Sequence, residues 1–406
     1  MAYGDRAVAP PPTPPAAACP TIRQPSLSGL ISSTACVGAF DPGDASRYLT
    51  LIWVPERAGV WLFARNGEWP GSDMSDVVVR RWDRCDADLL AAPACRASAH
   101  NVTAPGDLDS ENLAHNAAAA WYNGTLLLIG GRYNHAGREF ERRNRPEDEQ
   151  RYRQRGVLLY EAPLADAHHA AGLRRSWRTR LLMDGSQAAA RHCIEARVNF
   201  RGRCQFDGHF SIAARRVGTG REWLLYARAN IAAGTPAGAG GRHVQVTRSL
   251  ISPYGPWSDF ELLQFGSWNA TDPVLPERNV YLPCVKRHPI GPTGVLLGLF
   301  PYYDRARAFI GMAISCDGVR FSELEPFATA PQGLLGRIAH LPVDGWIAQK
   351  HSEHVHFFIH HNVPGIVTSG VSSVVRHSVA KAALKNHTGR AMRTLPSCAR
   401  FFGHVR

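Results

Sequence analysis

The chain has 406 residues, of which 45% are hydrophobic and 20% are charged, a composition typical of a folded globular protein. No stretch reaches the ~18 apolar residues that span a bilayer, so no membrane span is expected. The formal net charge of +12 favours an anionic partner or a solvated basic surface. Zinc-finger spacing, aromatic ribonucleoprotein motifs and dense lysine runs are lacking, which argues against nucleic acid as that partner.

The first 38 residues are rich in Pro and Ala, which predicts a disordered arm and lead-in. This arm lacks the apolar run of a signal peptide. The nine cysteines and four N-x-S/T sequons nevertheless favour a disulfide-containing glycoprotein of the secretory pathway or extracellular space, whose leader is not present in this sequence. Cys85 with Cys95, and Cys193 with Cys204, are near enough in sequence to close short loops, but the pairing stays open.

Beyond the arm, the chain repeats a hairpin of two strands rich in Val, Ile, Leu, Phe and Trp, joined by a Gly-rich or polar turn. The hairpins lie near residues 48–67, 115–134, 206–230, 279–304 and 342–362. A third strand follows each hairpin, and a more polar fourth strand follows several of them. The charged segment 137–154 and the Gly-rich segment 231–241 are predicted to be loops inserted between strands.

This four-stranded antiparallel unit recurs every roughly 60–95 residues. The repeat predicts an all-β fold, a five-bladed β-propeller over residues 39–390, with 391–406 as a C-terminal tail or closing strand. Because the spacing of the repeats is unequal, a β-sandwich or two unrelated β domains is the alternative.

The first strand of a propeller blade lines the central channel, and the second returns antiparallel to it. The start of the first and the end of the second therefore lie on one face, where their side chains form a polar funnel. The candidate binding residues at these positions are Arg65, His115, Asn116, Arg132, Asn134, His209, Arg228, Asn230, Asn279, His340 and His361. Arg provides a donor fork for carboxylate or sulfate, while Asn and His hydrogen-bond sugar hydroxyls. The alternative is that these are turn residues that pair between neighbouring blades.

Two motifs add a family resemblance to this pattern. They are "FDGHFSIA", with Asp207 at the start of a first strand, and "SCDGVRFSEL", in which Asp317 and Gly318 shape a turn and Phe321 packs. Together with the number of blades, they resemble the arabinanase, xylosidase and invertase-like glycoside hydrolases. The resemblance covers most of the chain, although its motifs are short.

The resemblance implies hydrolysis of a glycosidic bond by carboxylates that face the funnel. On this basis Asp207 and Asp344 are the candidate essential carboxylates, and Glu277 is a candidate acid. His340 or His209 would assist proton transfer. The expected partner is an acidic or sulfated glycan, with no cofactor or metal, and the protein is expected to be a monomer.

One departure from the family pattern favours a different function. Where the family has His-Asp-Pro or Asn-Asp-Pro, this chain has His115, Asn116 and Ala117, and Asn cannot act as a general base. The alternative is therefore a glycan-binding or protein-interaction propeller that has lost its catalytic base. A sugar transferase would share the same fold. The His-rich segment 351–361 contains no HExxH motif, and a zinc site there is the weaker interpretation.

Overall fold

The computed structural model defines strands and helices along most of the chain. It describes residues 37–40, 46–54, 59–66, 78–85, 100–101, 115–131, 156–167, 178–184, 193–194, 206, 208–230, 241–266, 278–304, 306–331, 338–363 and 372–402. No helix in these residues is both long enough and apolar enough to cross a bilayer.

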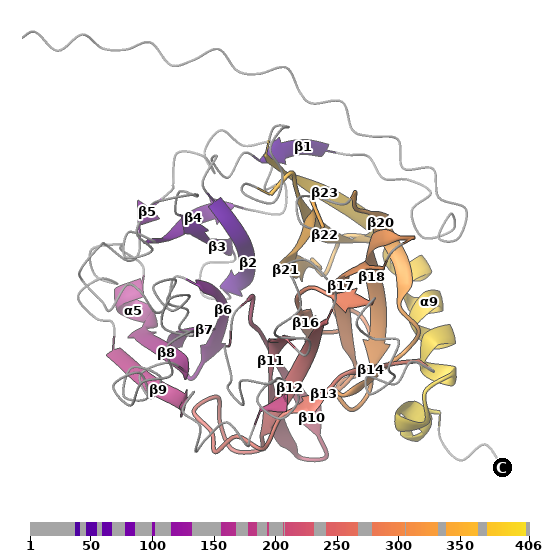
Figure 1. The fold of residues 1–406 in the computed structure, drawn as a ribbon, viewed down its shortest axis with the longest axis horizontal. Coiled ribbons are helices and arrows are strands. Elements are labelled where there is room, and N and C mark those ends of the chain that lie inside the picture. The colour runs from indigo at the N-terminus through magenta and orange to yellow at the C-terminus, as the bar shows by residue number, and fades with distance from the viewer. Residues whose placement is uncertain are drawn as a thin grey trace, which may run out of the picture.

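In the described part of the chain the strands form five blades (Figure 1). Blade one contains β2 (Ser46–Val54), β3 (Gly59–Asn66), β4 (Val78–Cys85) and β5 (His100–Asn101). Blade two contains β6 (His115–Tyr122), β7 (Thr125–Gly131), β8 (Gly156–Pro163) and β9 (Arg178–Asp184), with the short helix α5 (Leu164–Ala167) between its last two strands. Blade three contains β10 (Ser211–Val217), β11 (Gly220–Asn230), β12 (Arg242–Ser249) and β13 (Glu261–Leu262).

The last two blades include strands from other parts of the chain. Blade four contains β15 (Asn279–Val280), β16 (Cys284–Arg287), β17 (Leu296–Tyr303), β18 (Ala308–Ser315), β19 (Arg320–Phe321) and β20 (Glu325–Thr329), and β14 (Gln264–Phe265) pairs in parallel with β19. Blade five contains β21 (Leu341–Ile347), β22 (His354–His361), β23 (Ser373–Ala380) and β1 (Val37–Phe40).

The innermost strands of the blades close a ring. In turn, β2 contacts β6, β6 contacts β10, β10 contacts β16, β16 contacts β21, and β21 returns to β2. The last step includes a parallel pairing of Thr50 with Asp344. A ring of five inner strands is the architecture of a five-bladed propeller, so the predicted fold is confirmed and the sandwich alternative does not apply.

The outermost strand of blade five comes from the N-terminal side of the chain. In β1, Val37 pairs with Arg376 and Phe40 pairs with Val374, both on β23. The strand thus begins within the segment that the sequence assigned to the arm. At the other end, helix α9 (Lys381–Arg393) and a 3-10 helix (Pro396–Phe401) pack beside blade four, where a tail or closing strand was expected.

The blades pack through apolar side chains that face one another across the gap between sheets. Between blades three and four, Tyr226 packs on Phe321, and Phe300 meets Phe321 edge to face with ring centroids 5.3 Å apart. All residues of β17 are buried, because neighbouring blades cover both of its faces. This explains why its sequence is a continuous apolar run instead of an alternating one.

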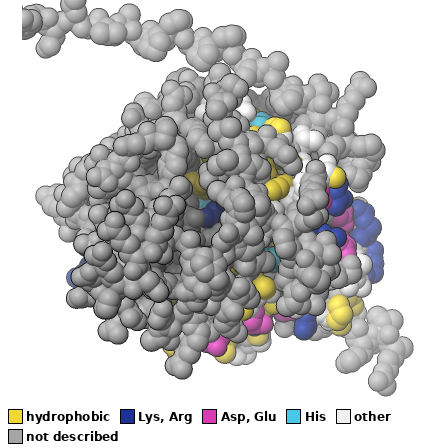
Figure 2. Space-filling model, viewed as in Figure 1, with side chains coloured by type: hydrophobic (Ala, Val, Ile, Leu, Met, Phe, Trp, Pro, Cys, Tyr) yellow, Lys and Arg dark blue, Asp and Glu magenta, His cyan; other side chains and the backbone are white. Residues whose placement is uncertain are grey.

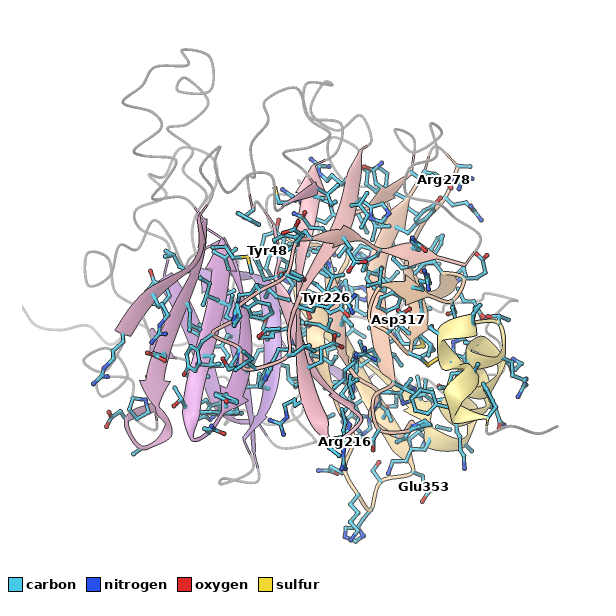
Figure 3. All side chains as sticks on the ribbon, turned by 90° about the horizontal axis from the view of Figure 1, so that it is seen from below. Tyr48, Arg216, Tyr226, Arg278, Asp317 and Glu353 are labelled. Carbon is cyan, nitrogen blue, oxygen red and sulfur yellow. A yellow bond between two sulfur atoms is a disulfide. The ribbon has the colours of Figure 1, made fainter. Side chains whose placement is uncertain are left out.

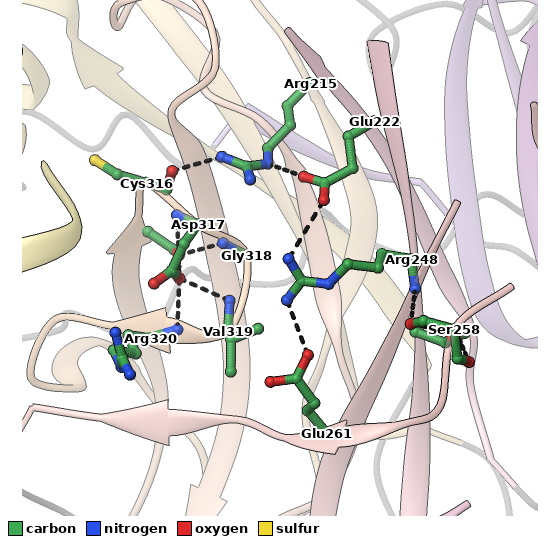
Figure 4. A network of polar contacts seen from close by, with 12 residues as sticks. Arg215, Glu222, Arg248, Ser258, Glu261, Cys316, Asp317, Gly318, Val319 and Arg320 are labelled. Carbon is green, nitrogen blue, oxygen red and sulfur yellow. Dashed lines mark hydrogen bonds and ion pairs between the residues drawn. The ribbon is translucent and has the colours of Figure 1, made fainter. Parts of the chain in front are cut away.

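A chain of ion pairs crosses blade three and reaches the turn that the sequence motif predicted (Figure 4). Glu222 accepts from Arg215 and Arg248, and Arg248 also pairs with Glu261 at 3.0 Å. The Arg215 guanidinium donates to the carbonyl of Cys316, at the start of that turn in blade four. The Asp317 carboxylate accepts from the backbone N–H groups of residues 319 and 320, which shapes the turn as predicted.

The surface seen down the propeller axis carries a basic side chain near its centre, beside hydrophobic ones (Figure 2). Charged side chains also gather at the edge where α9 lies. Two sequon asparagines are exposed: Asn123 in the β6–β7 turn and Asn386 on α9. Both are accessible positions for the glycans that the sequence predicts, and the glycans themselves stay a prediction.

A disulfide between Cys316 and Cys398 fastens the 3-10 helix to blade four. The bond encloses a sequence separation of 82 residues, which spans the rest of blade four, most of blade five and α9. A cross-link over a long loop restricts the unfolded chain more than a short one does. Cys193 is also disulfide-bonded, whereas Cys284 is a buried free thiol.

Replacing both partners of this cross-link, in C316S/C398S, should lower the free energy of unfolding by about 2–4 kcal/mol, because the unfolded chain regains the entropy of that loop. Guanidinium unfolding followed by circular dichroism measures this change. The C284S variant is the matched control, because it replaces a buried cysteine without opening a loop. Equal stability of C316S/C398S and the unmodified protein would contradict the assigned role.

Candidate functional site

The strand registers bring the predicted positions to one face of the propeller, which we call the mouth. The start of each first strand pairs with the end of the second in four blades: Ser46 with Asn66, His115 with Gly131, Asn279 with Tyr303, and Leu341 with His360. In blade three, β11 extends beyond β10 to Asn230, which pairs with Arg242 of β12. Within each of these four blades the start of the first strand thus lies beside the end of the second, as the hairpin pattern predicts.

A cluster of aromatic and cationic side chains, the mouth cluster, lies at this face: Tyr48, His209, Arg228, Arg242 and Tyr281. The guanidiniums of Arg228 and Arg242 lie 5.4 and 5.3 Å from the centre of the Tyr281 ring. The Tyr281 hydroxyl is 3.3 Å from that of Tyr48, whose ring stacks on His209. Blades one, three and four therefore all contribute to the mouth cluster, and two of its side chains, Arg228 and Arg242, carry a positive charge. Tyr48 is labelled in Figure 3.

Asn279 holds the mouth cluster in place. It is buried, and its side-chain oxygen accepts a hydrogen bond of 3.0 Å from the backbone N–H of Arg242. The Arg242 guanidinium also donates to the Tyr303 hydroxyl, at 3.4 Å. Asn279, predicted as a binding residue, thus acts on the backbone that carries Arg242.

The segment before β10 approaches Arg228 so closely that only glycine fits at position 208. A Cβ atom there would lie 2.9 Å from both Cβ and Nε of Arg228, and Gly208 has φ +128°, a conformation that residues with a side chain rarely adopt. This contact explains the Gly of the FDGH motif. It also places His209, next in the chain, against Tyr48.

Asp344 lies deeper than the sequence indicated. It is in the middle of β21, three residues after the strand begins, and it is fully buried. An irregularity in the pairing of β21 follows Asp344, where Gly345 has φ +139°. A Cβ atom at Gly345 would lie 2.5 Å from the carbonyl oxygen of Leu51, so the glycine allows β21 to approach β2. Asp344 therefore belongs to the channel wall.

Both carboxylate oxygens of Asp344 are engaged. Oδ2 pairs with Nζ of Lys286 at 2.7 Å, and Oδ1 accepts a hydrogen bond of 2.7 Å from the Ser211 hydroxyl. Lys286 also donates to the carbonyl of Ile212, at 3.1 Å. The His209 Nε2 atom is 3.8 Å from Oδ2, too far for a direct hydrogen bond. This ion pair ties the inner strands of blades three, four and five together.

The charges near Asp344 decide its ionisation. Burial alone would raise the pKa of Asp344. The Lys286 ammonium and the nearby His209 lower it by more, so the pKa lies below its usual value. The carboxylate is thus ionised at neutral pH. Burial raises the pKa of the neighbouring Cys284 thiol, and the Asp344 charge raises it further, so Cys284 stays a thiol.

His209, Cys284 and Asp344 form the one group of metal-donor atoms found in the described residues, all within 4.8 Å of one another. The Lys286 ammonium already provides the positive charge that a cation would bring to Asp344. Because cysteine binds metals as a thiolate, the raised pKa of Cys284 also disfavours a metal. The arrangement therefore fits an internal ion pair better than a metal centre.

Replacing Lys286 by methionine should destabilise the protein by about 3–5 kcal/mol at pH 7, because Asp344 would keep a buried, uncompensated charge. The folded pKa of Asp344 lies below its unfolded value, so its stabilising contribution is present at neutral pH and is lost as the pH falls through the folded pKa. In K286M burial is no longer opposed by the ammonium and raises the pKa of Asp344, so the effect of K286M should shrink as the pH is lowered from 7 and the carboxyl takes up a proton.

Urea unfolding at several pH values measures the effect of K286M. The K350M variant is the matched control, because Lys350 is exposed. A stability loss no greater in K286M than in K350M would show that the ion pair does not hold the channel together.

Blade five contains a cluster of buried histidines. His340, just before β21, stacks on His361 at the end of β22 with ring centroids 4.1 Å apart, and His361 stacks on His377 of β23 at 6.3 Å. His340 and His361 were both predicted to be at the mouth, and the structure brings them together. Burial, and then the neighbouring His340, lower the pKa of His361 to about 3 and that of His377 to about 4. These rings are therefore neutral at physiological pH.

Acid should destabilise the protein through this cluster. The folded pKa of His377 is below its unfolded value of about 6.5, so the unfolded chain takes up the proton first and stability falls from about pH 6.5 down to about pH 4. In the described residues neither ring nitrogen of His377 has a hydrogen-bond partner, so H377F should fold. The variant should reduce the slope of the free energy of unfolding against pH by about 1.4 kcal/mol per pH unit in that range.

Chemical unfolding between pH 7 and pH 4 measures this slope. The H351F variant is the control, because His351 is exposed, and its slope should equal that of the unmodified protein. An unchanged slope in H377F would show that His377 is not neutral in the folded protein.

Several predicted residues are not placed by the structure. Asp207, Glu277, Arg132 and Asn134 lie outside the described residues. Four others are placed by their backbone alone, at strand ends on the mouth face: Arg65 on β3, His115 and Asn116 on β6, and Asn230 on β11. Their roles as catalytic or binding residues stay predictions.

Five residues of the site were not predicted from the sequence: Tyr48, Ser211, Arg242, Tyr281 and Lys286. Tyr48 and Tyr281 lie within two residues of the polar strand starts Arg47 and Asn279, whereas Arg242 begins a third strand and has no such signal. Lys286 had a clearer signal. It follows the buried residues Cys284 and Val285 in an inner strand, and a charge at such a position needs a partner.

Comparison with known proteins gives matches in structure only. No family profile matches the sequence, and no curated protein matches it. The chain is similar to the catalytic domain of the Coprinopsis cinerea GH62 α-L-arabinofuranosidase, with 10% identity over 86% of this chain and 96% of that one, and a TM-score of 0.49.

Two further solved structures are also similar to this chain. An N-acetylgalactosamine deacetylase from F. plautii, in complex with blood group B trisaccharide, has 8% identity over 86% of this chain and 94% of that one, with a TM-score of 0.47. The GH43_1 enzyme from Xanthomonas citri has 12% identity over 87% and 92%, with a TM-score of 0.44. At this level of similarity none of these proteins determines the function of this chain.

Proposed function

We propose that this protein is a carbohydrate-active propeller that binds an acidic or sulfated glycan at its mouth. The observation that carries the proposal is the convergence of Arg228 and Arg242 on the ring of Tyr281, beside Tyr48. Arginine recognises planar carboxylates and sulfates through paired N–H donors. Tyrosines at the same place offer hydroxyls for hydrogen bonds to a sugar.

The charge at the mouth supports an anionic ligand over a neutral one. Arg242 makes no ion pair with a carboxylate in the described part of the chain, and its guanidinium contacts only an aromatic ring and a hydroxyl. Asp344, the buried carboxylate near the axis, is neutralised by Lys286. Among the described residues of the mouth cluster the net charge is therefore positive, in line with the net charge of +12 for the chain.

A second candidate is hydrolysis of the bound glycan, with Asp207 and Glu277 as the carboxylates. The observation that favours it is the contact between Gly208 and Arg228, because it fixes the residue next to Asp207 at the mouth cluster. In this candidate Asp344 is a positioning residue, because its oxygens are engaged by Lys286 and Ser211 and its proton affinity is low. Its role is to keep the inner strands, and with them His209, in place.

Binding is tested by isothermal titration with a heparin-derived hexasaccharide, an oligogalacturonide and neutral xylohexaose. The R242Q variant should bind the two anionic probes about tenfold more weakly, which corresponds to the loss of about 1.4 kcal/mol of charge-assisted hydrogen bonding. The R320Q variant is the matched control, because Arg320 is an exposed residue of the blade-four turn whose backbone contacts stay intact. Equal affinity of R242Q and R320Q, or preference for the neutral probe, would reject the proposal.

Chromatography of the same mixtures tests hydrolysis. Release of shorter products by the unmodified protein, and its loss in D207N with binding retained, would support the enzyme. Binding without products in the unmodified protein would reject hydrolysis and leave the binding function.

A further inference from the structure

A pocket opens at the end of the channel opposite the mouth. We call it the rear pocket. It has a volume of about 770 Å³, within the range of small-ligand sites. All five inner strands contribute to its wall, through Ile52 of β2, Trp121 of β6, Arg216 of β10, Arg287 of β16 and Trp346 of β21. In Figure 3, Arg216 lies near the lower end of the strands, whereas Tyr48 and Arg278 lie nearer the upper end.

The rear pocket is strongly cationic. Among the described residues that line it, five are basic and none is acidic: Arg215, Arg216, Arg221, Lys286 and Arg287. Two of these charges are already neutralised, Arg215 by Glu222 and Lys286 by Asp344. The other three are exposed, and within the described chain none of them pairs with a carboxylate. The Arg216 Nε atom donates only to the carbonyl of Gly218, at 3.3 Å.

The β10–β11 hairpin concentrates this charge at the rim of the pocket. Arg216 and Arg221 stand directly opposite each other in its register, next to the paired Arg215 and Glu222. Like charges at opposed positions of two strands destabilise a sheet, so this pair works against the hairpin when the pocket is empty. An anion between the two guanidiniums would turn that repulsion into attraction on both sides.

Indole rings line the same pocket. Trp121 and Trp346 are partly exposed, and Trp223 lies under the guanidinium of Arg221 at 5.8 Å. Indole faces offer a flat apolar surface to the C–H face of a sugar ring. Inorganic anions need only the arginines, whereas the tryptophans suit a larger ligand with an apolar side.

We propose that the rear pocket is a second ligand site, which binds an anionic saccharide: a sugar that carries a carboxylate or sulfate group held by Arg216, Arg221 and Arg287, with its ring against Trp121 and Trp346. The site is separate from the mouth and does not depend on the function proposed for it. The buried ion pair of Lys286 and Asp344 stands between the two, because Lys286 lines the rear pocket while Asp344 lies within reach of His209.

Hydrogen exchange with mass spectrometry, in the presence of the heparin-derived hexasaccharide, locates this site. In the unmodified protein and in R242Q, residues 211–221 should gain protection on addition of the hexasaccharide. In R216Q/R221Q that protection should disappear. The affinity of the rear pocket for the hexasaccharide should fall at least about tenfold, because two charge-assisted contacts are lost. R287Q, which leaves the hairpin unchanged, should give an intermediate loss.

The R390Q/R393Q variant is the matched control, because it removes the same charge from exposed positions on α9, and it should bind like the unmodified protein. R216Q/R221Q should melt no lower than the unmodified protein, since its opposed charges are gone. Three results would overturn the proposal: protection of 211–221 that persists in R216Q/R221Q, equal protection by neutral cellohexaose, or the full effect with sodium sulfate alone, which would indicate an adventitious ion only. If the hexasaccharide protects residues 211–221 but gives no protection at the mouth, only the function proposed for the mouth is rejected and the rear site stands.

Discussion

The ion pair between Asp344 and Lys286 sits where the inner strands of three blades meet. A carboxylate with no exposed surface costs several kcal/mol to bury, and it is tolerated only because an ammonium and a hydroxyl satisfy it. Lys286 is on β16, Ser211 is on β10 and Asp344 is on β21, so the interaction fixes these strands relative to one another. His209 and Tyr281 of the mouth cluster shortly precede β10 and β16, and Arg216 and Arg287 of the rear pocket lie near the other ends of these two strands.

The two ends of the channel differ in how their positive charge is arranged. At the mouth the guanidiniums of Arg228 and Arg242 lie on an aromatic ring. Arg228 is buried and Arg242 is partly buried. At the rear pocket Arg216, Arg221 and Arg287 are exposed to solvent. Salt screens exposed charges more strongly than buried ones, so binding at the rear is expected to depend more on ionic strength. Such a difference would let one polyanionic chain bind at two places whose affinities depend differently on salt concentration.

The fold was predictable because the hairpin repeat encodes it directly. Alternating apolar runs with Gly-rich turns define the strands, and five copies of one unit leave few arrangements other than a ring. The residues of the site were only partly predictable. Strand ends could be assigned to the mouth, but Tyr48 and Tyr281 were missed because they lie next to the polar ends. Asp344 was expected to face the funnel, whereas an irregularity at Gly345 holds it buried within the channel wall, which the strand pattern of the sequence does not show.

The position of β1 affects the order in which the molecule can form. Val37 pairs with Arg376, so the outer edge of blade five is completed by residues from the beginning of the chain. During synthesis β1 emerges before β23 and has no partner until the more than 300 residues between the two strands have followed. Contacts between residues this far apart in sequence form slowly, because a very large loop has to close. Until that happens, β23 has an unpaired edge that can pair with another chain, and the last blade is the place where misassembly would begin.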